Sequence, residues 1–135
     1  MKAVKFFAYL LVIISTSVFT NCTPENLDYG STTKETITKT QWSVDYFFAG
    51  QDVTAQFSNY KINFVGNGIV TANDGTNMVS GTWSMVTDVN RNEVLRISIP
   101  EAHLQVLNDQ WKVKQTSDDV LTMNGASSEI RLKKN

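Results

Sequence analysis

The residue whose chemistry is most clearly indicated by its position is Cys22, the single cysteine of the 135-residue chain. It has no second cysteine with which to form an internal disulfide bond. It follows an apolar run, residues 6–19, which is itself preceded by Lys2 and Lys5. A short basic start followed by an apolar run of this length is typical of a secretory signal peptide. We therefore predict that residues 1–21 are removed on export and that Cys22 becomes the first residue of the mature chain.

The segment just before the cysteine resembles a lipobox, at which lipoprotein signal peptidase cuts ahead of a lipid-modified cysteine. Asn21 stands where the family usually has Gly, Ala or Ser, and Phe19 stands where Leu is commonest. The resemblance implies a lipid anchor on Cys22, and each buried lipid methylene contributes about 0.8 kcal/mol to membrane attachment. The alternatives are an uncleaved N-terminal anchor, a cleaved signal in which Cys22 has no role, and a thiol that bridges two molecules.

The single histidine, His103, lies two residues after Glu101. A Ser-His-Asp arrangement needs a histidine held between a nucleophile and an acid, and the sequence has no nucleophile elbow. We expect His103 to be a partly exposed loop or helix residue and the protein not to be an enzyme. If it were a hydrolase, replacing His103 with alanine would abolish the activity. One histidine and one cysteine are too few for a Cys/His zinc site.

Alternating oxygen-bearing residues, Asp88, Asn90 and Asn92, match the first ligand positions of a calcium-binding loop. Glu93 occupies the position that requires glycine, and Ile99 occupies the position that requires glutamate. We therefore predict a polar hairpin turn here, and neither a metal nor a cofactor for the chain.

The elements that must position these residues begin after Cys22. Residues 22–36 are polar, contain Pro24 and Gly30, and show no periodic apolar pattern, so we predict a flexible tether. Residues 37–135 form the predicted domain. Apolar and polar residues alternate there in seven runs, which centre on residues 42–46, 60–64, 83–85, 95–99, 111–113, 121–123 and 130–132.

Turn residues such as Gly66-Asn67-Gly68 separate these runs at intervals of about 8–12 residues, which is typical of an all-β sandwich or barrel. Two segments break the alternation. Residues 52–58 are expected to form a helical turn or a loop with Phe57 pointing inward. Residues 100–107 are expected to form one or two helical turns, with Leu104 and Leu107 closing one end of a barrel.

A set of Trp, Gly and apolar motifs is spread over the predicted domain. These motifs are Trp42, Asp52-Val-Thr54 with Phe57, Tyr60-Lys-Ile-Asn-Phe64 with Gly68, Gly81-Thr-Trp83, Leu107-Asn-Asp-Gln-Trp111-Lys-Val113 and Glu129-Ile-Arg-Leu132. In these motifs the chain from about Thr38 to its end resembles lipocalin-like domains of small exported bacterial lipoproteins. The resemblance implies an antiparallel up-and-down β-barrel of about eight strands with one short helical segment. Unlike the larger lipocalins, which have Gly-x-Trp at the first strand, this chain is short and has Gly81-Thr-Trp83 at mid-chain.

An eight-stranded barrel is just wide enough to be filled by side chains or to hold one small ligand. The predicted inward residues therefore either form a packed core or line an apolar pocket near one mouth. In the second case a hydroxyl of Tyr46 or Tyr60 would orient the ligand. The candidate ligand-binding residues of the interior are Trp42, Tyr46, Tyr60, Phe64, Trp83, Met85 and Trp111.

We therefore expect a membrane-anchored lipocalin-like lipoprotein that binds a small apolar ligand in or at the mouth of the barrel. The alternative is a structural or protein-interaction lipoprotein with a fully packed barrel. Without residues 1–21 the chain has 10 basic and 13 acidic residues, a net charge of about −3, so we expect no nucleic-acid partner. Thr23, rather than Asp, after the cysteine favours the outer membrane as the location in the cell envelope.

Overall fold

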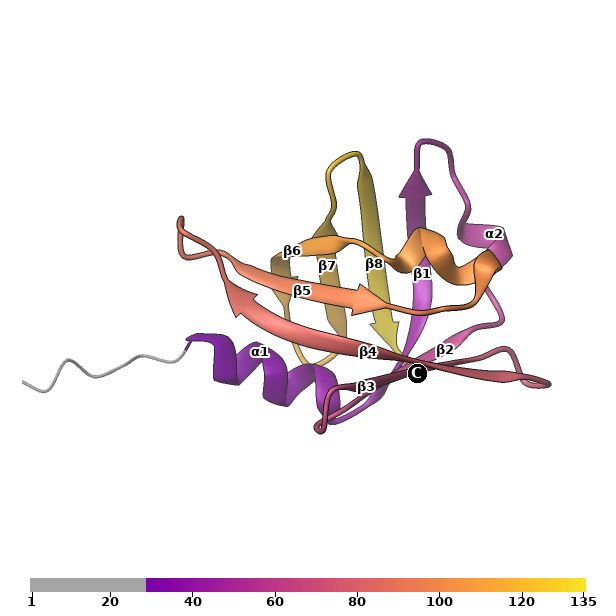
Figure 1. Ribbon diagram of the computed structural model, residues 1–135, viewed down its shortest axis with the longest axis horizontal. Coiled ribbons are helices and arrows are strands. Elements are labelled where there is room, and N and C mark those ends of the chain that lie inside the picture. The colour runs from indigo at the N-terminus through magenta and orange to yellow at the C-terminus, as the bar shows by residue number, and fades with distance from the viewer. Residues whose placement is uncertain (1–28) are drawn as a thin grey trace, which may run out of the picture.

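The computed structural model describes residues 29–135, in which eight strands close into an antiparallel barrel in sequence order (Figure 1). Each strand pairs with its neighbours in the chain, and β1 pairs with β8 to complete the barrel. The predicted all-β up-and-down barrel is thus confirmed. The strands are β1 (Gln41–Ala49), β2 (Lys61–Val65), β3 (Ile69–Asn73), β4 (Met78–Thr87), β5 (Glu93–Ser98), β6 (Gln110–Thr116), β7 (Val120–Asn124) and β8 (Ser128–Lys134).

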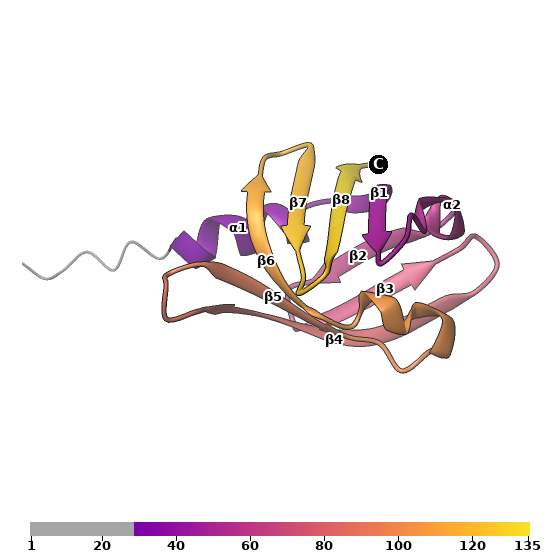
Figure 2. The ribbon, with the colours of Figure 1, turned by 90° about the horizontal axis from the view of Figure 1, so that it is seen from above.

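Three short helices lie at the two ends of this barrel. Helix α1 (Tyr29–Thr38) precedes β1, helix α2 (Thr54–Phe57) connects β1 to β2, and the 3-10 helix η1 (Ala102–Leu107) connects β5 to β6. Both ribbon views place α1 at one end and α2 with η1 at the other (Figures 1 and 2). We call these the α1 end and the η1 end. No helix within residues 29–135 has the length and apolar character needed to cross a membrane.

The two helical segments predicted between strands are confirmed. Phe57 of α2 and Leu104 and Leu107 of η1 are buried in the core, where they close the η1 end. The sequence Asp52-Val-Thr54 positions α2 through hydrogen bonds. The carboxylate of Asp52 accepts one from the Thr54 amide at 2.9 Å, and the Thr54 hydroxyl accepts one from the Phe47 amide at 2.9 Å.

Helix α1 differs from the tether predicted for residues 22–36, because its first residues occupy the second half of that segment. Thr33 and Ile37, one helical turn apart, are both buried against the barrel. The Ile37 carbonyl also accepts a hydrogen bond of 3.0 Å from the Trp42 indole. Tertiary burial of one face stabilises a short helix whose residues have weak helical propensity. The predicted signal peptide, Cys22 and residues 22–28 of the tether lie outside the described residues.

Aromatic side chains pack closely inside the barrel. Trp42, Phe47, Phe64 and Trp111 are fully buried. The ring centroids of Phe47 and Trp111 are 5.9 Å apart in an edge contact, and those of Phe64 and Trp83 are 5.6 Å apart in another. Such tilted contacts are the favoured geometry for aromatic pairs. The interior at these positions is therefore a packed core.

One predicted inward residue points outward because β1 contains a bulge. The pairing of β1 with β8 shifts register between Val44 and Tyr46. An extra residue in one strand reverses which later side chains face inward. Phe47, rather than Tyr46, therefore enters the core, and Tyr46 lies on the outer surface with the Arg131 guanidinium 5.9 Å from its ring centroid.

The Gly81-Thr-Trp83 sequence has a clear structural role. A Cβ atom at Gly81 would collide with the backbone carbonyl of Ser98 and with Ile99, on or just after the adjacent β5. Only glycine allows this close approach of backbones. Two residues later, the Trp83 indole donates a hydrogen bond of 2.9 Å to the Val65 carbonyl. This sequence therefore serves strand packing.

Candidate functional site

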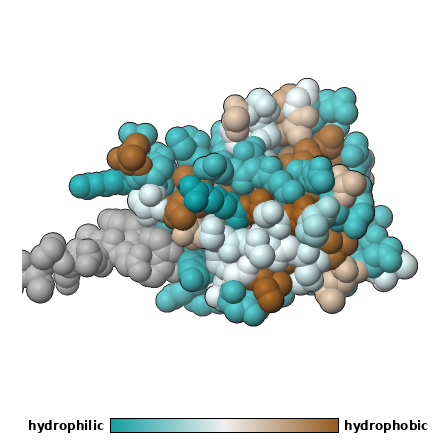
Figure 3. Space-filling view, viewed as in Figure 1, coloured by the Kyte–Doolittle hydropathy of each residue, from teal (hydrophilic) through white to brown (hydrophobic). Residues whose placement is uncertain are grey.

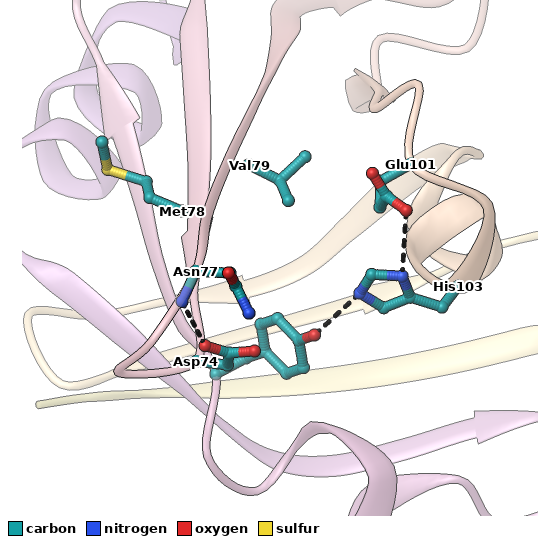
Figure 4. Close-up of a pocket in the computed structure, with 7 residues that line it drawn as sticks. Asp74, Asn77, Met78, Val79, Glu101 and His103 are labelled. Atoms are coloured by element: carbon teal, nitrogen blue, oxygen red, sulfur yellow. Dashed lines mark hydrogen bonds and ion pairs between the residues drawn. The ribbon is translucent and has the colours of Figure 1, made fainter.

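A surface pocket of about 360 Å³ lies at the η1 end, between the β3–β4 hairpin and the segment that leads into η1 (Figure 4). It combines an aromatic hydroxyl, an imidazole, two carboxylates, an amide and two apolar side chains. We call it the Tyr60–His103 pocket, and its lining residues are Tyr60, Asp74, Asn77, Met78, Val79, Glu101 and His103.

One hydrogen bond and one close carboxylate–imidazole contact link three side chains across the pocket. The Tyr60 hydroxyl lies 2.8 Å from Nε2 of His103, and Nδ1 of the same imidazole lies 3.3 Å from Oε1 of Glu101 (Figure 4). In a neutral imidazole one nitrogen donates and the other accepts. The Tyr60 hydroxyl and the imidazole thus share one hydrogen bond, and the Glu101 carboxylate lies beside the other ring nitrogen. The Tyr60 oxygen then retains lone pairs that a ligand can approach.

These three side chains come from two connections of the barrel, because Glu101 and His103 both lie between β5 and β6. Tyr60 lies between α2 and β2, and its ring packs on Phe57 with centroids 5.7 Å apart. His103 is the second residue of η1, which Leu104 and Leu107 hold against the core. The buried neighbours fix the positions of Tyr60 and His103, while 56% of the His103 side chain remains exposed to solvent. The expected partial exposure of His103 is thus confirmed.

The two walls of the pocket are held by local hydrogen bonds. In the β3–β4 hairpin, Oδ1 of Asp74 accepts from the amides of Thr76 and Asn77 at 2.8 and 2.7 Å. Opposite, the Asn108 side chain accepts from the Ile99 amide at 2.6 Å and donates to the Ile99 carbonyl at 2.8 Å. The Asn108 bonds clamp the segment that contains η1. The pocket therefore has preformed walls.

The electrostatics of the pocket keep its phenol neutral and one carboxylate charged. Burial raises the pKa of Tyr60 above its ordinary value, and the nearby carboxylates of Asp74 and Glu101 raise it further. Hydrogen bonds from Asn77 and Thr76 lower the pKa of Asp74. At neutral pH the pocket thus presents a protonated tyrosine beside an ionised aspartate.

The structure does not bring the seven predicted ligand-binding residues together in one pocket. Trp42, Phe64, Trp83 and Trp111 belong to the packed core, and Met85 is a half-buried side chain packed against it. Tyr46 lies on the outer surface. Tyr60 is the one member of the predicted set that lines the Tyr60–His103 pocket.

Sequence reasoning missed most of this pocket. No sequence signal marked Asp74 or Asn77 as site residues, and Glu101 and His103 were expected in a helical segment. Tyr60 and His103 are 43 positions apart, and they meet because the β2 and β5 strands approach the same end of the barrel. A tyrosine at the start of a strand and a histidine in a helical insert were the available signals.

The predicted polar turn at residues 88–92 is confirmed. Oδ1 of Asp88 accepts from the amides of Asn90 and Asn92, both at 2.8 Å, and the Asn92 side-chain amide donates to the same carboxylate. These hydrogen bonds lower the pKa of Asp88, and the bond from the Asn92 side chain has the largest effect. The carboxylate therefore organises the turn. Within residues 29–135, no three His, Cys, Asp or Glu residues cluster as a metal site requires.

Comparison with known proteins adds information on the fold. No family model matches the chain, and no curated protein matches it. A similar solved structure is the crystal structure of a DUF4847 family protein from Bacteroides vulgatus at 1.00 Å resolution, with a TM-score of 0.55 and 15% sequence identity. The alignment covers 76% of this chain and 96% of that one. The likeness shows the fold alone. It agrees with the small barrel domain that the sequence resemblance implied.

Proposed function

We propose that this chain is a lipid-anchored protein of the cell envelope that binds a small ligand in the Tyr60–His103 pocket. The barrel serves as a rigid scaffold for that pocket. The observation that carries the proposal is the convergence of Tyr60, Glu101 and His103 beside a hollow with preformed walls. One hydrogen bond and one carboxylate–imidazole contact link the three side chains. Ligand sites typically combine a preformed cavity with a few convergent polar groups.

The lining indicates an amphipathic ligand, in place of the purely apolar one expected from the sequence. Asp74 and Glu101 supply carboxylates, and the lining includes neither lysine nor arginine. A ligand with hydroxyl or amino groups can donate hydrogen bonds to these acceptors. Met78, whose residue surface is 67% exposed, provides an apolar contact beside them.

The same geometry supports binding in preference to catalysis. A tyrosine acts as a nucleophile or base in its ionised form. The raised pKa of Tyr60 favours the neutral phenol, which is suited to hydrogen bonding. We keep, as part of the proposal, that the protein is not an enzyme.

The anchor part of the proposal rests on Cys22 and on the apolar run that precedes it. In cells supplied with radiolabelled palmitate, we expect the wild-type chain to be labelled and to sediment with membranes. The Cys22→Ser variant should be unlabelled and should not remain in the membrane fraction. An unlabelled wild-type chain would contradict the anchor and leave an exported barrel.

The ligand part is testable by an NMR screen of the mature chain against a collection of small amphipathic fragments. We expect some fragments to shift the amide signals of Asn77 and His103, and Tyr60→Phe to weaken their binding about tenfold, since one hydrogen bond to a ligand is worth about 1 kcal/mol or more. Tyr46→Phe is the matched control, because it removes a hydroxyl outside the pocket. If no fragment shifts these signals, the structural or protein-interaction alternative with its packed barrel is favoured.

A further inference from the structure

The α1 end carries an unusual apolar side chain. Val89, at the tip of the β4–β5 hairpin, is 98% exposed, more than any other large apolar residue described as exposed. The hydropathy surface in Figure 3 shows an isolated hydrophobic protrusion at the tip of this hairpin, surrounded by polar surface. The neighbouring turn residues are polar, and Asp88, Asn90 and Asn92 form hydrogen bonds with one another.

A rigid turn holds Val89 in this position. The amide of Asp88 donates to the Asn92 carbonyl at 2.9 Å, and the amide of Arg91 donates to the Asp88 carbonyl at 3.0 Å. Arg91 adopts a positive φ of 63°, which few residues other than glycine favour. Together with the Asp88 carboxylate bonds, this geometry fixes a turn that displays an apolar residue and a cation two positions apart.

The same hairpin lies beside the start of helix α1, where the chain leads back to the proposed anchor. Both ribbon views place the hairpin tip at the same end of the barrel as the first turn of α1 (Figures 1 and 2). The Thr33 hydroxyl donates to the Glu93 carboxylate at the base of the hairpin. Tyr29 lies seven residues after Cys22, and seven fully extended residues span at most about 25 Å.

A lipid on Cys22 would therefore keep the α1 end within a short distance of the bilayer. We propose that the tip of the β4–β5 hairpin rests on the lipid surface, with Val89 entering the interface and Arg91 facing the phosphate headgroups. Apolar side chains beside cations are favoured at such interfaces. The Tyr60–His103 pocket, at the opposite end, then faces away from the membrane. This inference rests on the lipid anchor of the proposed function.

The test uses the lipidated full-length protein, reconstituted into vesicles of phosphatidylethanolamine and phosphatidylglycerol. Val89→Cys is labelled with an environment-sensitive fluorophore, and Met78→Cys at the η1 end is the matched control, since both replace an exposed apolar residue. The Cys22 thiol is not available for labelling when it carries lipid. We expect emission from position 89 to shift to shorter wavelength and to be quenched several-fold more by spin-labelled lipid than emission from position 78.

A second measurement avoids the apolar label. Hydrogen exchange of the unlabelled protein on vesicles should show slower exchange across residues 88–92 than the Cys22→Ser variant in solution. Exchange across residues 74–78 should be unchanged. This comparison keeps the proposal testable if the labelled variant does not fold.

The outcomes separate the orientation from the anchor. Flotation with the vesicles, together with burial of position 89 alone, supports both. Flotation with positions 89 and 78 equally exposed, or with position 78 buried, overturns the orientation and leaves the anchor intact. A chain that does not float with the vesicles overturns the anchor and this inference with it.

Discussion

The two ends of the barrel are closed by different kinds of contact. At the η1 end, short inserts between neighbouring strands place the apolar side chains of Phe57, Leu104 and Leu107 into the core. At the α1 end, a helix that precedes the first strand packs across the opening through Ile37 and Thr33. The closure of the η1 end is apolar and built from connecting segments, whereas the closure of the α1 end depends on one helix that precedes the first strand.

The α1 end also contains buried polar side-chain atoms, whereas the residues that close the η1 end are apolar. Thr33 donates to one oxygen of Glu93, while the other oxygen, Oε1, is buried without a hydrogen-bond partner within the described residues. The same holds for the hydroxyl of Thr116, which lies at this end of β6. A buried polar atom without a partner reduces stability. We therefore expect the α1 end to open more easily than the η1 end.

The largest effect should come from removing the aromatic plug of the η1 end. Phe57→Ala leaves a cavity beside Phe47, whose ring centroid is 5.1 Å from that of Phe57. We expect the free energy of unfolding to fall by about 3–5 kcal/mol, as is typical for a buried phenylalanine. Urea denaturation followed by circular dichroism measures this loss.

Phe48→Ala is the matched control, because Phe48 is an exposed phenylalanine on the neighbouring strand β1. Its loss should be below about 1 kcal/mol, since exposed side chains contribute little. Equal losses for the two variants would show that α2 does not close the η1 end as described.

A smaller effect should follow from removing the polar contact of the α1 end. Thr33→Val deletes the donor to Glu93 in a buried position, and we expect a loss of about 1–2 kcal/mol. The loss should be concentrated in α1, whose amide protons should exchange faster while those of the barrel strands change little.

Thr38→Val is the control on the same helix, because the Thr38 hydroxyl bonds only to the Lys34 and Glu35 carbonyls of the helix itself. Its effect should stay within about 0.5 kcal/mol. If Thr33→Val instead accelerated exchange equally in α1 and in the strands, α1 would be part of the global folding unit.

The strands and the η1 end were predictable because their signals are local. Alternation identifies a strand without knowledge of its partners, and Phe57, Leu104 and Leu107 are the bulkiest apolar residues of their two inserts. The outward turn of Tyr46 was not predictable, since the bulge depends on how β1 pairs with β8, some 80 residues away. Helix α1 was missed because its residues are mostly polar and its stability derives from contacts with the barrel.

The candidate site was predictable only in part, for the same reason. Tyr60 was expected to offer a hydroxyl to a ligand, and it does line the Tyr60–His103 pocket. Its partners His103 and Asp74 come from other connections, and only the order of strands around the barrel places them beside it. Local patterns identify strands, whereas a site built from several connections depends on the closed topology.

The smallest effects, and the sharpest comparison of the two ends, concern two half-buried aspartates. Asp74 organises the β3–β4 turn at the η1 end, and Asp88 organises the β4–β5 turn at the α1 end. Hydrogen bonds lower the pKa of both below the ordinary value of 3.8. A carboxyl whose pKa is lower in the folded chain stabilises it above the unfolded value, and this contribution is lost as the pH falls through the folded value. Stability should therefore decrease below about pH 4.

Asp74→Asn and Asp88→Asn each retain an acceptor oxygen but remove the charge, so both variants should lose part of this acid dependence. The decrease in the urea midpoint between neutral and acid pH should be shallower in each variant than in the wild type. Asp88 also lies 4.0 Å from the Lys112 ammonium, so raising the salt concentration should reduce its contribution more than that of Asp74. An identical salt response at both positions would contradict a contribution from Lys112. The hydrogen bonds to the two carboxylates would then account for the stabilisation at both turns.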